Sequence, residues 1–190
     1  MAKALIVSVG GSPEPVAKSI AEHGAELLCF FASQDSVISI GPALARAQEL
    51  VGDKWRRPRY QTILADDAED LAHCYGRALS CAAWIEDQGV DPETVIVDYT
   101  GGTKTMTAAL ALATVGKGFS FSYVGGKERD KEGVGVVVTG AEVMRAGLDP
   151  WRLFAVEERR TIASAFNAFQ FDAALGVVGD LLKRGTAGPA

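Results

Sequence analysis

Short apolar runs alternate with longer segments of helical periodicity between residues 4 and 139 of this chain. Such alternation is typical of a mostly parallel β-sheet whose strands are joined by crossover helices. The expected strands are 4–9, 26–31, 60–64, 94–98 and 119–124, followed by a later strand at 134–139. The expected helices are 13–25, about 36–51, 67–88 and 103–117. We therefore predict an α/β fold with helices on both faces of the sheet.

Two of the runs, 4–9 and 94–98, have the continuous apolar character of strands that are covered on both faces. Glycine, which readily adopts the left-handed conformation that ends a helix, closes several of the helical patterns. These residues are Gly24, Gly52, Gly89 and Gly118. The charged, glycine-flanked segment 127–133 is expected to be an exposed loop.

After Asp149-Pro150 the sequence shows helical patterns only. Apolar residues recur there at spacings of three and four, namely Phe166, Phe169, Ala173, Val177 and Leu181. We predict a domain at 1–150 and a short C-terminal helical extension at 151–190. An amphipathic helix pair must bury its apolar stripe against the sheet domain, a partner chain or a further domain. We interpret the extension as the start of a longer helical or effector domain.

The charge of the chain limits its partners. The formal net charge is -5 and the pI is about 5.1, so we expect no DNA partner, and any site for a polyanion must be local. Apolar residues make up 48% and charged residues 23%, the balance of a soluble globular protein. No apolar run is long enough to cross a bilayer, so we expect a cytoplasmic protein without membrane contact.

The sequence predicts neither a metal nor a cofactor. The three cysteines form no CxxC pair and the two histidines lie in separate segments, so no zinc pattern is present. The turn VGGSPEP, 9–15, lacks the GxGxxG pattern of a nicotinamide site. The turn DYTGGTKT, 98–105, is not a Walker loop, because Thr103 separates Gly102 from Lys104.

These two turns follow the first and fourth strands, which the chain order makes plausible neighbours. Ligands of open parallel sheets bind beyond the carboxyl ends of the strands, where the strand order reverses. In the second turn, Gly101 and Gly102 allow close backbone approach, and a helix beginning near Thr103 presents unpaired amides. Thr100 and Thr103 add hydroxyls and Lys104 adds a positive charge. This set of donors fits a phosphodiester.

A purely structural interpretation of the second turn remains open. Asp98, Thr100 and Thr103 could cap a helix, and the glycines could simply turn the chain. We expect Asp98 to brace the turn through backbone hydrogen bonds rather than to contact an anion.

The first turn is expected to be the weaker anion site. Its two prolines remove amide donors from the following helix, and Glu14 adds negative charge. Gly10, Gly11 and the hydroxyl of Ser12 remain usable as ligand contacts. The alternative is a tight turn in which Ser12 only caps the helix.

Together the two turns resemble the CRISPR-associated Rossmann fold (CARF) sensor domains of type III CRISPR systems. The resemblance is carried by LIVSVGGSPEP, 5–15, and by DYTGGTKTM, 98–106. The second stretch is similar to the family signature of Asp or Asn, any residue, Ser or Thr, Gly-Gly-Thr-Lys, any residue, Met. FNAFQFDAAL, 166–175, is similar to the start of the helical domain that follows in many members. The resemblance covers 1–150 as a Rossmann-like sensor and the remainder weakly.

The resemblance implies that a homodimer binds a cyclic oligoadenylate across its twofold axis, usually the tetra-adenylate and in some branches the hexa-adenylate. It also implies that the sensor regulates an effector in an antiviral response. The residues it would place at the ligand are Gly10, Gly11, Ser12, Thr100, Gly101, Gly102, Thr103 and Lys104. As adenine contacts we select by position, in the loops after the second and fifth strands, Ser33, Gln34, Tyr123, Gly125 and Lys127.

Besides a sensor, the sequence is compatible with a ring nuclease and with an ordinary nucleotide or sugar-phosphate binder, but it does not encode the effector nuclease common in the family. Members of the family often carry a HEPN ribonuclease, whose motif is Arg, then four to six residues, then His; neither His23 nor His73 has an arginine four to seven positions before it. Some CARF domains instead cleave their ligand as ring nucleases. For a slow, metal-independent cleavage the candidates are Ser12, Thr100 and Lys104. An ordinary nucleotide or sugar-phosphate binder of the same fold is the third possibility.

The basic run KWRRPR, 54–59, precedes the third strand. It is therefore expected at the amino ends of the strands, opposite the predicted pocket. We interpret it as a solvated loop or a contact with another domain, with Trp55 covering a neighbouring helix.

Overall fold

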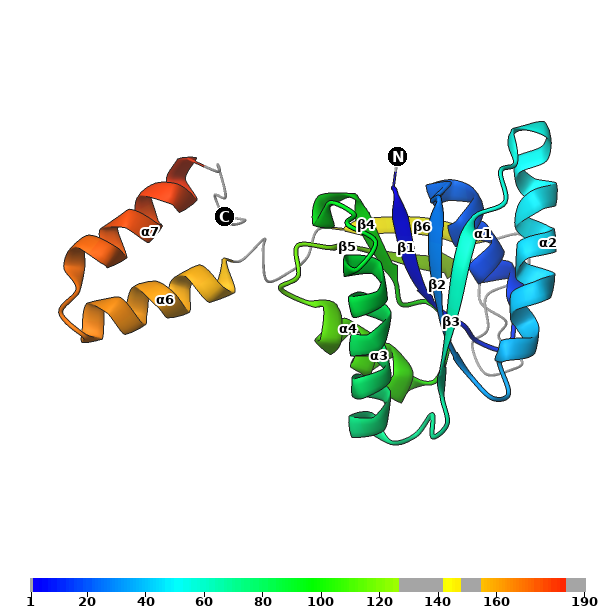
Figure 1. The fold of residues 1–190 in the computed structure, drawn as a ribbon, viewed down its shortest axis with the longest axis horizontal. Coiled ribbons are helices and arrows are strands. Elements are labelled where there is room, and N and C mark those ends of the chain that lie inside the picture. Colours follow the sequence, from blue (N-terminus) through cyan, green and yellow to red (C-terminus); the bar gives the residue numbers. More distant parts are fainter. Residues whose placement is uncertain (1, 127–141, 148–154, 184–190) are drawn as a thin grey trace. The chain divides into compact units, whose positions relative to one another are not determined.

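The computed structural model describes residues 2–126, 142–147 and 155–183. The chain divides into two compact units, Met1–Gly147 and Leu148–Ala190, and each is described by itself (Figure 1).

The first unit is built on a six-stranded sheet in the order β3-β2-β1-β4-β5-β6. Its strands are β1 Ala4–Ser8, β2 Leu27–Ser33, β3 Arg59–Ala65, β4 Val95–Asp98, β5 Ser120–Gly126 and β6 Glu142–Gly147. Strands β1 to β5 are parallel, and β6 pairs antiparallel with β5. The order reverses between β1 and β4, where Val7 pairs with Asp98. The predicted α/β fold with a mostly parallel sheet is therefore confirmed.

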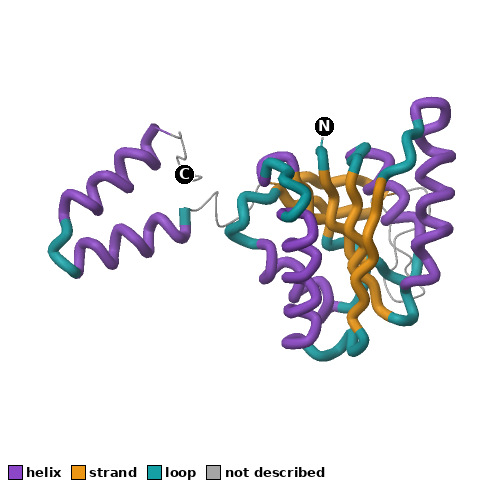
Figure 2. The backbone as a smooth tube through the Cα atoms, in the orientation of Figure 1, coloured by secondary structure: helices purple, strands orange, loops and turns teal. Residues whose placement is uncertain are grey.

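Helices cover both faces of the sheet (Figure 2). They are α1 Pro13–His23, α2 Ile40–Val51, α3 Leu71–Glu86 and α4 Lys104–Thr114. Short 3₁₀ turns lie at Val37–Ser39, Gly52–Lys54 and Pro92–Thr94. One core cluster lies between the sheet and α1 with α2, and the other lies between the sheet and α3 with α4.

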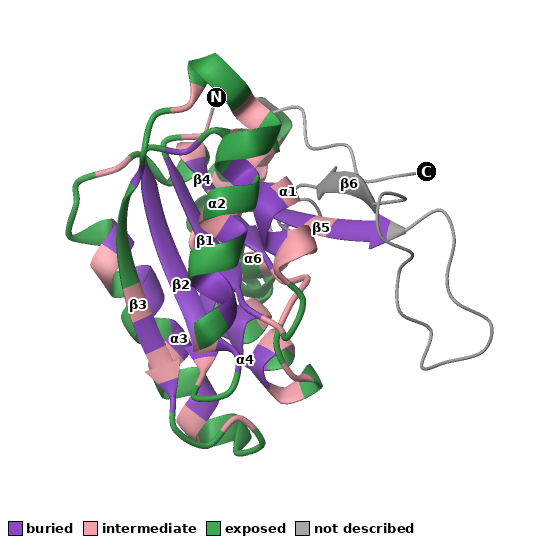
Figure 3. Cartoon of the chain, turned by 90° about the vertical axis from the view of Figure 1, so that its right-hand side faces the viewer, coloured by how far each residue is buried: buried purple, intermediate pink, exposed green. Residues whose placement is uncertain are grey.

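Strand β1 contributes to both clusters, which explains its continuous apolar run. Leu5 and Val7 face the α1–α2 cluster, whereas Ala4 and Ile6 face the α3–α4 cluster. Successive strand residues point to opposite faces, so a central strand with a helical layer on each side has no solvent-facing position. Figure 3 shows this buried centre of the sheet beneath the exposed outer face of α2.

The sequence-based boundaries were incomplete at the far edge of the sheet. Strand β6 was not predicted, because EVMRAG alternates polar and apolar residues only weakly and gains its strand conformation by pairing with β5. The strand predicted at 134–139 and the loop predicted at 127–133 lie outside the described residues. The helix predicted from 67 begins at Leu71, where Asp70 accepts a capping hydrogen bond. The glycines predicted to end helices all have positive φ.

The second unit is a helical hairpin of α6 Val156–Asn167 and α7 Phe171–Lys183. Ala165 on α6 and Ala174 on α7 are its buried residues near the connection. The predicted C-terminal helical extension is thus present. Among residues 2–126, 142–147 and 155–183, no helix combines the length and the apolarity needed to span a membrane.

Burial in the sheet core predicts the cost of truncating one side chain. Leu28 of β2 is fully buried, so Leu28→Ala should lower the free energy of unfolding by about 2–5 kcal/mol. Leu112 on α4 is 55% exposed, so the control Leu112→Ala should change it by about 0.5 kcal/mol or less. Urea denaturation followed by circular dichroism measures both. Equal costs would contradict the core position of Leu28.

Candidate functional site

The two glycine turns lie in direct backbone contact beyond the carboxyl ends of β1 and β4. A Cβ on Gly10 would lie 3.1 Å from the amide nitrogen of Gly102. A Cβ on Gly101 would overlap the carbonyl oxygen of Ser8 and would lie 2.6 Å from the amide nitrogen of Gly10. The close approach leaves no room for a side chain at Gly101. The structure therefore brings the two predicted segments together.

Asp98 stabilises the second turn through the hydrogen bonds of its side chain. Its side chain is fully buried and accepts three hydrogen bonds. Oδ1 accepts from the amide of Thr100 at 3.0 Å, and Oδ2 accepts from the hydroxyls of Ser19 at 2.8 Å and Ser122 at 2.9 Å. A buried carboxylate without such donors would be strongly destabilising. Asp98 has the bracing role expected from the sequence.

The two threonines of the turn differ in what they leave for a ligand. Thr103 caps α4: its Oγ1 accepts from the amide of Met106 at 3.1 Å and donates to the carbonyl oxygen of Ala68 at 2.7 Å. The cap agrees with the structural interpretation of the turn, and the contact with Ala68, which was not predicted, already uses the hydroxyl hydrogen. Thr100 Oγ1 accepts from the amide of Val124 at 2.7 Å, which leaves its hydroxyl hydrogen for another acceptor.

Lys104 is the first residue of α4 and is exposed. Within the described part of the chain, no carboxylate forms an ion pair with it. Since Thr103 caps only the amide of Met106, the amides of Lys104 and Thr105 remain at the positive end of the helix. Gly102, at φ 81°, turns the chain into this helix and is exposed. The start of α4 is thus an open, positively charged group of donors.

Ser12 lies at the start of α1 but makes no capping hydrogen bond through its side chain. The position that such a cap would normally reach, three residues on, is Pro15, which has no amide hydrogen. Ser12 therefore occupies the N-cap position, but the alternative in which its hydroxyl caps the helix is not supported by a hydrogen bond. Ser12 and Gly11 are both exposed beside the second turn.

The residues selected for adenine contacts are not all in loops. Ser33 is the last residue of β2 and exchanges hydrogen bonds with Ser36. Gly125 is buried inside β5, paired with Val143, so its assignment to a loop was wrong. Tyr123, also in β5, stacks on Tyr99 with ring centroids 5.6 Å apart. Lys127 lies outside the described residues.

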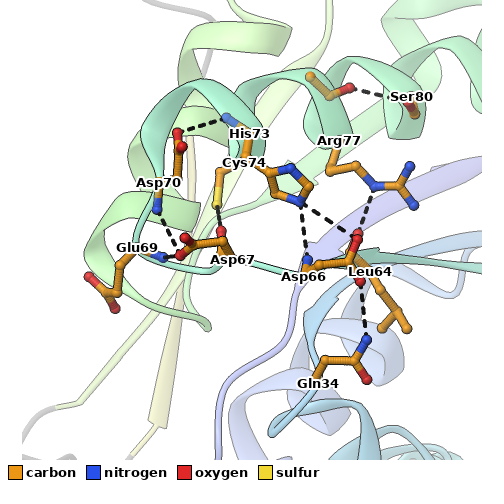
Figure 4. A network of polar contacts seen from close by, with 11 residues as sticks. Gln34, Leu64, Asp66, Asp67, Glu69, Asp70, His73, Cys74, Arg77 and Ser80 are labelled. Carbon is orange, nitrogen blue, oxygen red and sulfur yellow. Dashed lines mark hydrogen bonds and ion pairs between the residues drawn. The ribbon is translucent and has the colours of Figure 1, made fainter.

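Gln34 follows β2 and donates to Oδ1 of Asp66 at 3.2 Å (Figure 4). Asp66 begins the loop between β3 and α3, in which Asp67 accepts from two backbone amides and Asp70 caps α3. Because Ala68 of this loop accepts from Thr103, the loop borders the second turn. The sequence-based prediction did not include this loop, because the predicted helix began at residue 67. Asp70 directly before the apolar Leu71 was the signal that could have shown the correct start.

His23 is connected to Asp98 through the hydroxyl of Ser122. Because the Ser122 hydroxyl donates its single hydrogen to Asp98, Nε2 of His23 donates to Ser122 Oγ, at 3.1 Å. Burial lowers the pKa of His23, although the negative charges of Asp98 and Glu22 oppose the shift. His23 is therefore a neutral member of the network that holds the turn.

The basic run 54–59 lies at the amino end of β3, opposite the turns. Its cationic residues are exposed, and Trp55 packs against the α1–α2 core cluster. The run takes no part in the candidate site.

No protein-family model matches the chain, and no curated protein matches it. Among solved structures, Csm6 of Enterococcus italicus bound to cyclic hexa-2'-fluoro-hexa-dAMP is similar at a TM-score of 0.64 and 12% identity. That match covers 95% of this chain and 49% of Csm6. Can2 from Sulfobacillus thermosulfidooxidans in complex with cyclic tetra-adenylate gives a TM-score of 0.50 at 11% identity, covering 87% and 46%.

A type III CRISPR defence DNA nuclease activated by cyclic oligoadenylate gives a TM-score of 0.50 at 14% identity, covering 80% of this chain and 22% of the nuclease. This chain thus spans less than half the length of each of these proteins. At these identities the likeness establishes the fold, and the resemblance to CARF domains is confirmed at that level.

The contact between the turns predicts different losses of stability for alanine substitutions at Gly101 and Gly11, one glycine from each turn. Gly101→Ala forces a Cβ into backbone atoms and should lower the free energy of unfolding by about 1–3 kcal/mol. Gly11→Ala meets no atom within 4 Å and should change it by about 0.5 kcal/mol or less. Urea denaturation checks both. A tolerated Gly101→Ala would show that the turns are not packed together.

The lowered pKa of His23 predicts a pH dependence of stability. As pH falls below 6.5, the unfolded chain binds a proton at His23 more readily than the folded chain, so this residue makes the folded state less stable. His23→Gln keeps a donor for Ser122 and does not titrate. The free energy of unfolding of His23→Gln minus that of wild type should therefore be constant above about pH 6.5. It should rise as the pH falls below this value. A difference independent of pH would contradict the lowered pKa.

Proposed function

We propose that this chain is a sensor domain that binds a cyclic oligoadenylate at the paired turns after β1 and β4. The observation that carries the proposal is the packing of the two glycine turns, which presents the open start of α4 at the point where the strand order reverses. Phosphate groups bind at such helix starts because unpaired amides and the helix dipole favour negative charge. The similarity to the folds of Csm6 and Can2, whose structures hold cyclic adenylates, supports this choice of ligand.

Within the proposed site the donors have distinct tasks. Lys104 supplies the charge that opposes a phosphodiester, and the first amides of α4 fix its oxygens. The hydroxyls of Thr100 and Ser12 are the remaining side-chain donors, since neither hydrogen is used in capping. Gly101 and Thr103 shape the turn rather than contribute side-chain donors. Gly10, Gly11 and Gly102 allow the ring to approach the backbone.

A homodimer completes the site in this proposal. A cyclic tetra-adenylate has twofold symmetry, so two copies of the chain can make each contact twice. Two Lys104 side chains and two helix starts then concentrate positive potential in one cleft, although the chain as a whole carries a net charge of -5. Ligand binding by this sensor would regulate an effector in a type III CRISPR antiviral response.

Lys104 gives the proposal its sharpest test. Lys104→Ala should weaken binding of cyclic tetra-adenylate by about 1.5–3 kcal/mol per charge-assisted contact. Lys117, beyond the other end of α4, is paired with Glu86 at 2.7 Å, so Lys117→Ala serves as the control and should leave affinity unchanged. Isothermal titration calorimetry with tetra- and hexa-adenylate rings measures both variants. Equal affinity of wild type and Lys104→Ala would remove this residue from the site.

The same samples separate the alternatives. A sensor returns the ring intact, whereas a ring nuclease returns linear di-adenylate, which chromatography resolves. Affinity for mononucleotides without affinity for the ring would overturn the proposal in favour of an ordinary nucleotide binder.

A further inference from the structure

One hydrogen bond between exposed side chains joins the two chain segments that flank the paired turns. These segments are the β2–α2 connection, 34–39, and the β3–α3 connection, 66–70. Nε2 of Gln34, directly after β2, donates to Oδ1 of Asp66, directly after β3, at 3.2 Å (Figure 4). Parallel strands bring both residues to the carboxyl edge of the sheet, the edge from which the glycine turns emerge. The pair therefore lies at the ligand-binding edge of the fold.

Each connection is also hydrogen-bonded to one of the turns. The hydroxyl of Ser39 donates to the carbonyl oxygen of Gly11 at 3.1 Å, so the β2–α2 connection contacts the first turn. The hydroxyl of Thr103 donates to the carbonyl oxygen of Ala68 at 2.7 Å, so the β3–α3 connection contacts the second turn. The hydrogen bond between the two connections completes a ring of contacts that includes both turns. The two connections therefore border the proposed site.

Asp66 fixes the orientation of the Gln34 side-chain amide. An ionised carboxylate only accepts hydrogen bonds, so the NH2 group of Gln34, and not its carbonyl oxygen, must face Asp66. The position of Asp66 is set in turn by His73 of α3, whose Nε2 accepts from the Asp66 backbone amide at 3.1 Å (Figure 4). Within the described part of the chain, Gln34 makes no other side-chain hydrogen bond. Its carbonyl oxygen and its second N–H are therefore available to a ligand.

The charges around the pair determine which part of a ligand can approach it. The β3–α3 connection carries four exposed carboxylates, namely Asp66, Asp67, Glu69 and Asp70. Like charges repel, so this side of the site disfavours a phosphodiester, which is attracted instead to Lys104 at the start of α4. Ile38, 77% exposed in the β2–α2 connection, adds apolar surface on the same side. An uncharged base therefore suits the Gln34 side of the site better than a phosphate does.

We propose that Gln34 recognises the 6-amino edge of an adenine in the ring, with Asp66 as the positioning residue for this contact. The inference rests on the proposed function, because it requires the cyclic adenylate to bind at the paired turns. A glutamine amide with a free carbonyl oxygen and a free N–H matches adenine, whose N6 donates and whose N7 accepts. Hypoxanthine presents two acceptors there, O6 and N7, so its O6 would oppose the carbonyl oxygen of Gln34. The site should therefore select adenine over hypoxanthine.

Isothermal titration calorimetry of the full chain with cyclic tetra-adenylate and cyclic tetra-inosinate tests this assignment. Wild type should bind the adenylate at least about tenfold more tightly, as expected of one bidentate contact. Gln34→Leu should bring the ratio of the two dissociation constants to about one, because the contact is lost. Asp66→Asn should lower the ratio at least about threefold, since an asparagine amide accepts either orientation of Gln34. Gln48→Leu, at an exposed position toward the other end of α2, is the matched control and should keep the wild-type ratio.

Each variant is measured with both rings, so a partly unfolded sample weakens both affinities alike and leaves their ratio intact. A ratio retained by Gln34→Leu, or a loss of affinity in Asp66→Asn that is equal for both rings, would overturn the assignment and leave the sensor function standing. Equal binding of the two rings by wild type would do the same. If wild type bound neither ring, the proposed function itself would fail, and this inference would fail with it.

Discussion

The contact of two backbone turns at the junction of β1 and β4 is the constraint on which the candidate site depends. The parallel sheet reverses its strand order at this junction, so both turns emerge at the same edge. Gly101 fits there only because it has no side chain, and Asp98 fixes the geometry through Thr100. Any displacement of this contact would move the start of α4 and Lys104 with it.

Asp98 connects the site to the core. A buried carboxylate is costly unless donors surround it, and hydrogen bonds to a charged group contribute about 1.5–3 kcal/mol each. Ser19 comes from α1 and Ser122 from β5, so the carboxylate ties a helix and two strands to the turn. His23 extends the network toward solvent as a neutral group. The same interactions therefore serve stability and preorganise the turn for an anion.

Most of the architecture could be predicted from sequence, because continuous apolar strands, helical periodicity and helix-ending glycines are local signals. The position of DYTGGTKT after a buried strand also predicted where the two turns would meet. Thr103 could not be assigned from sequence, since a threonine before a helix can serve as a cap or as a ligand donor. Its contact with Ala68 depends on a loop 35 residues away. The absence of a side-chain capping hydrogen bond at Ser12 could have been anticipated, because Pro15 has no amide hydrogen to donate. Strand β6 and the burial of Gly125 depend on pairing at the sheet edge, which leaves little local trace.

Amide chemical shifts in a nuclear magnetic resonance titration with cyclic tetra-adenylate test the central proposal most directly. Binding at the paired turns predicts that cyclic tetra-adenylate causes the largest shift changes at the amides of Gly10, Gly11, Gly101, Gly102 and Lys104. A titration with AMP should not cause these changes. Absence of such changes, or changes confined to the basic run at 54–59, would contradict the proposed site.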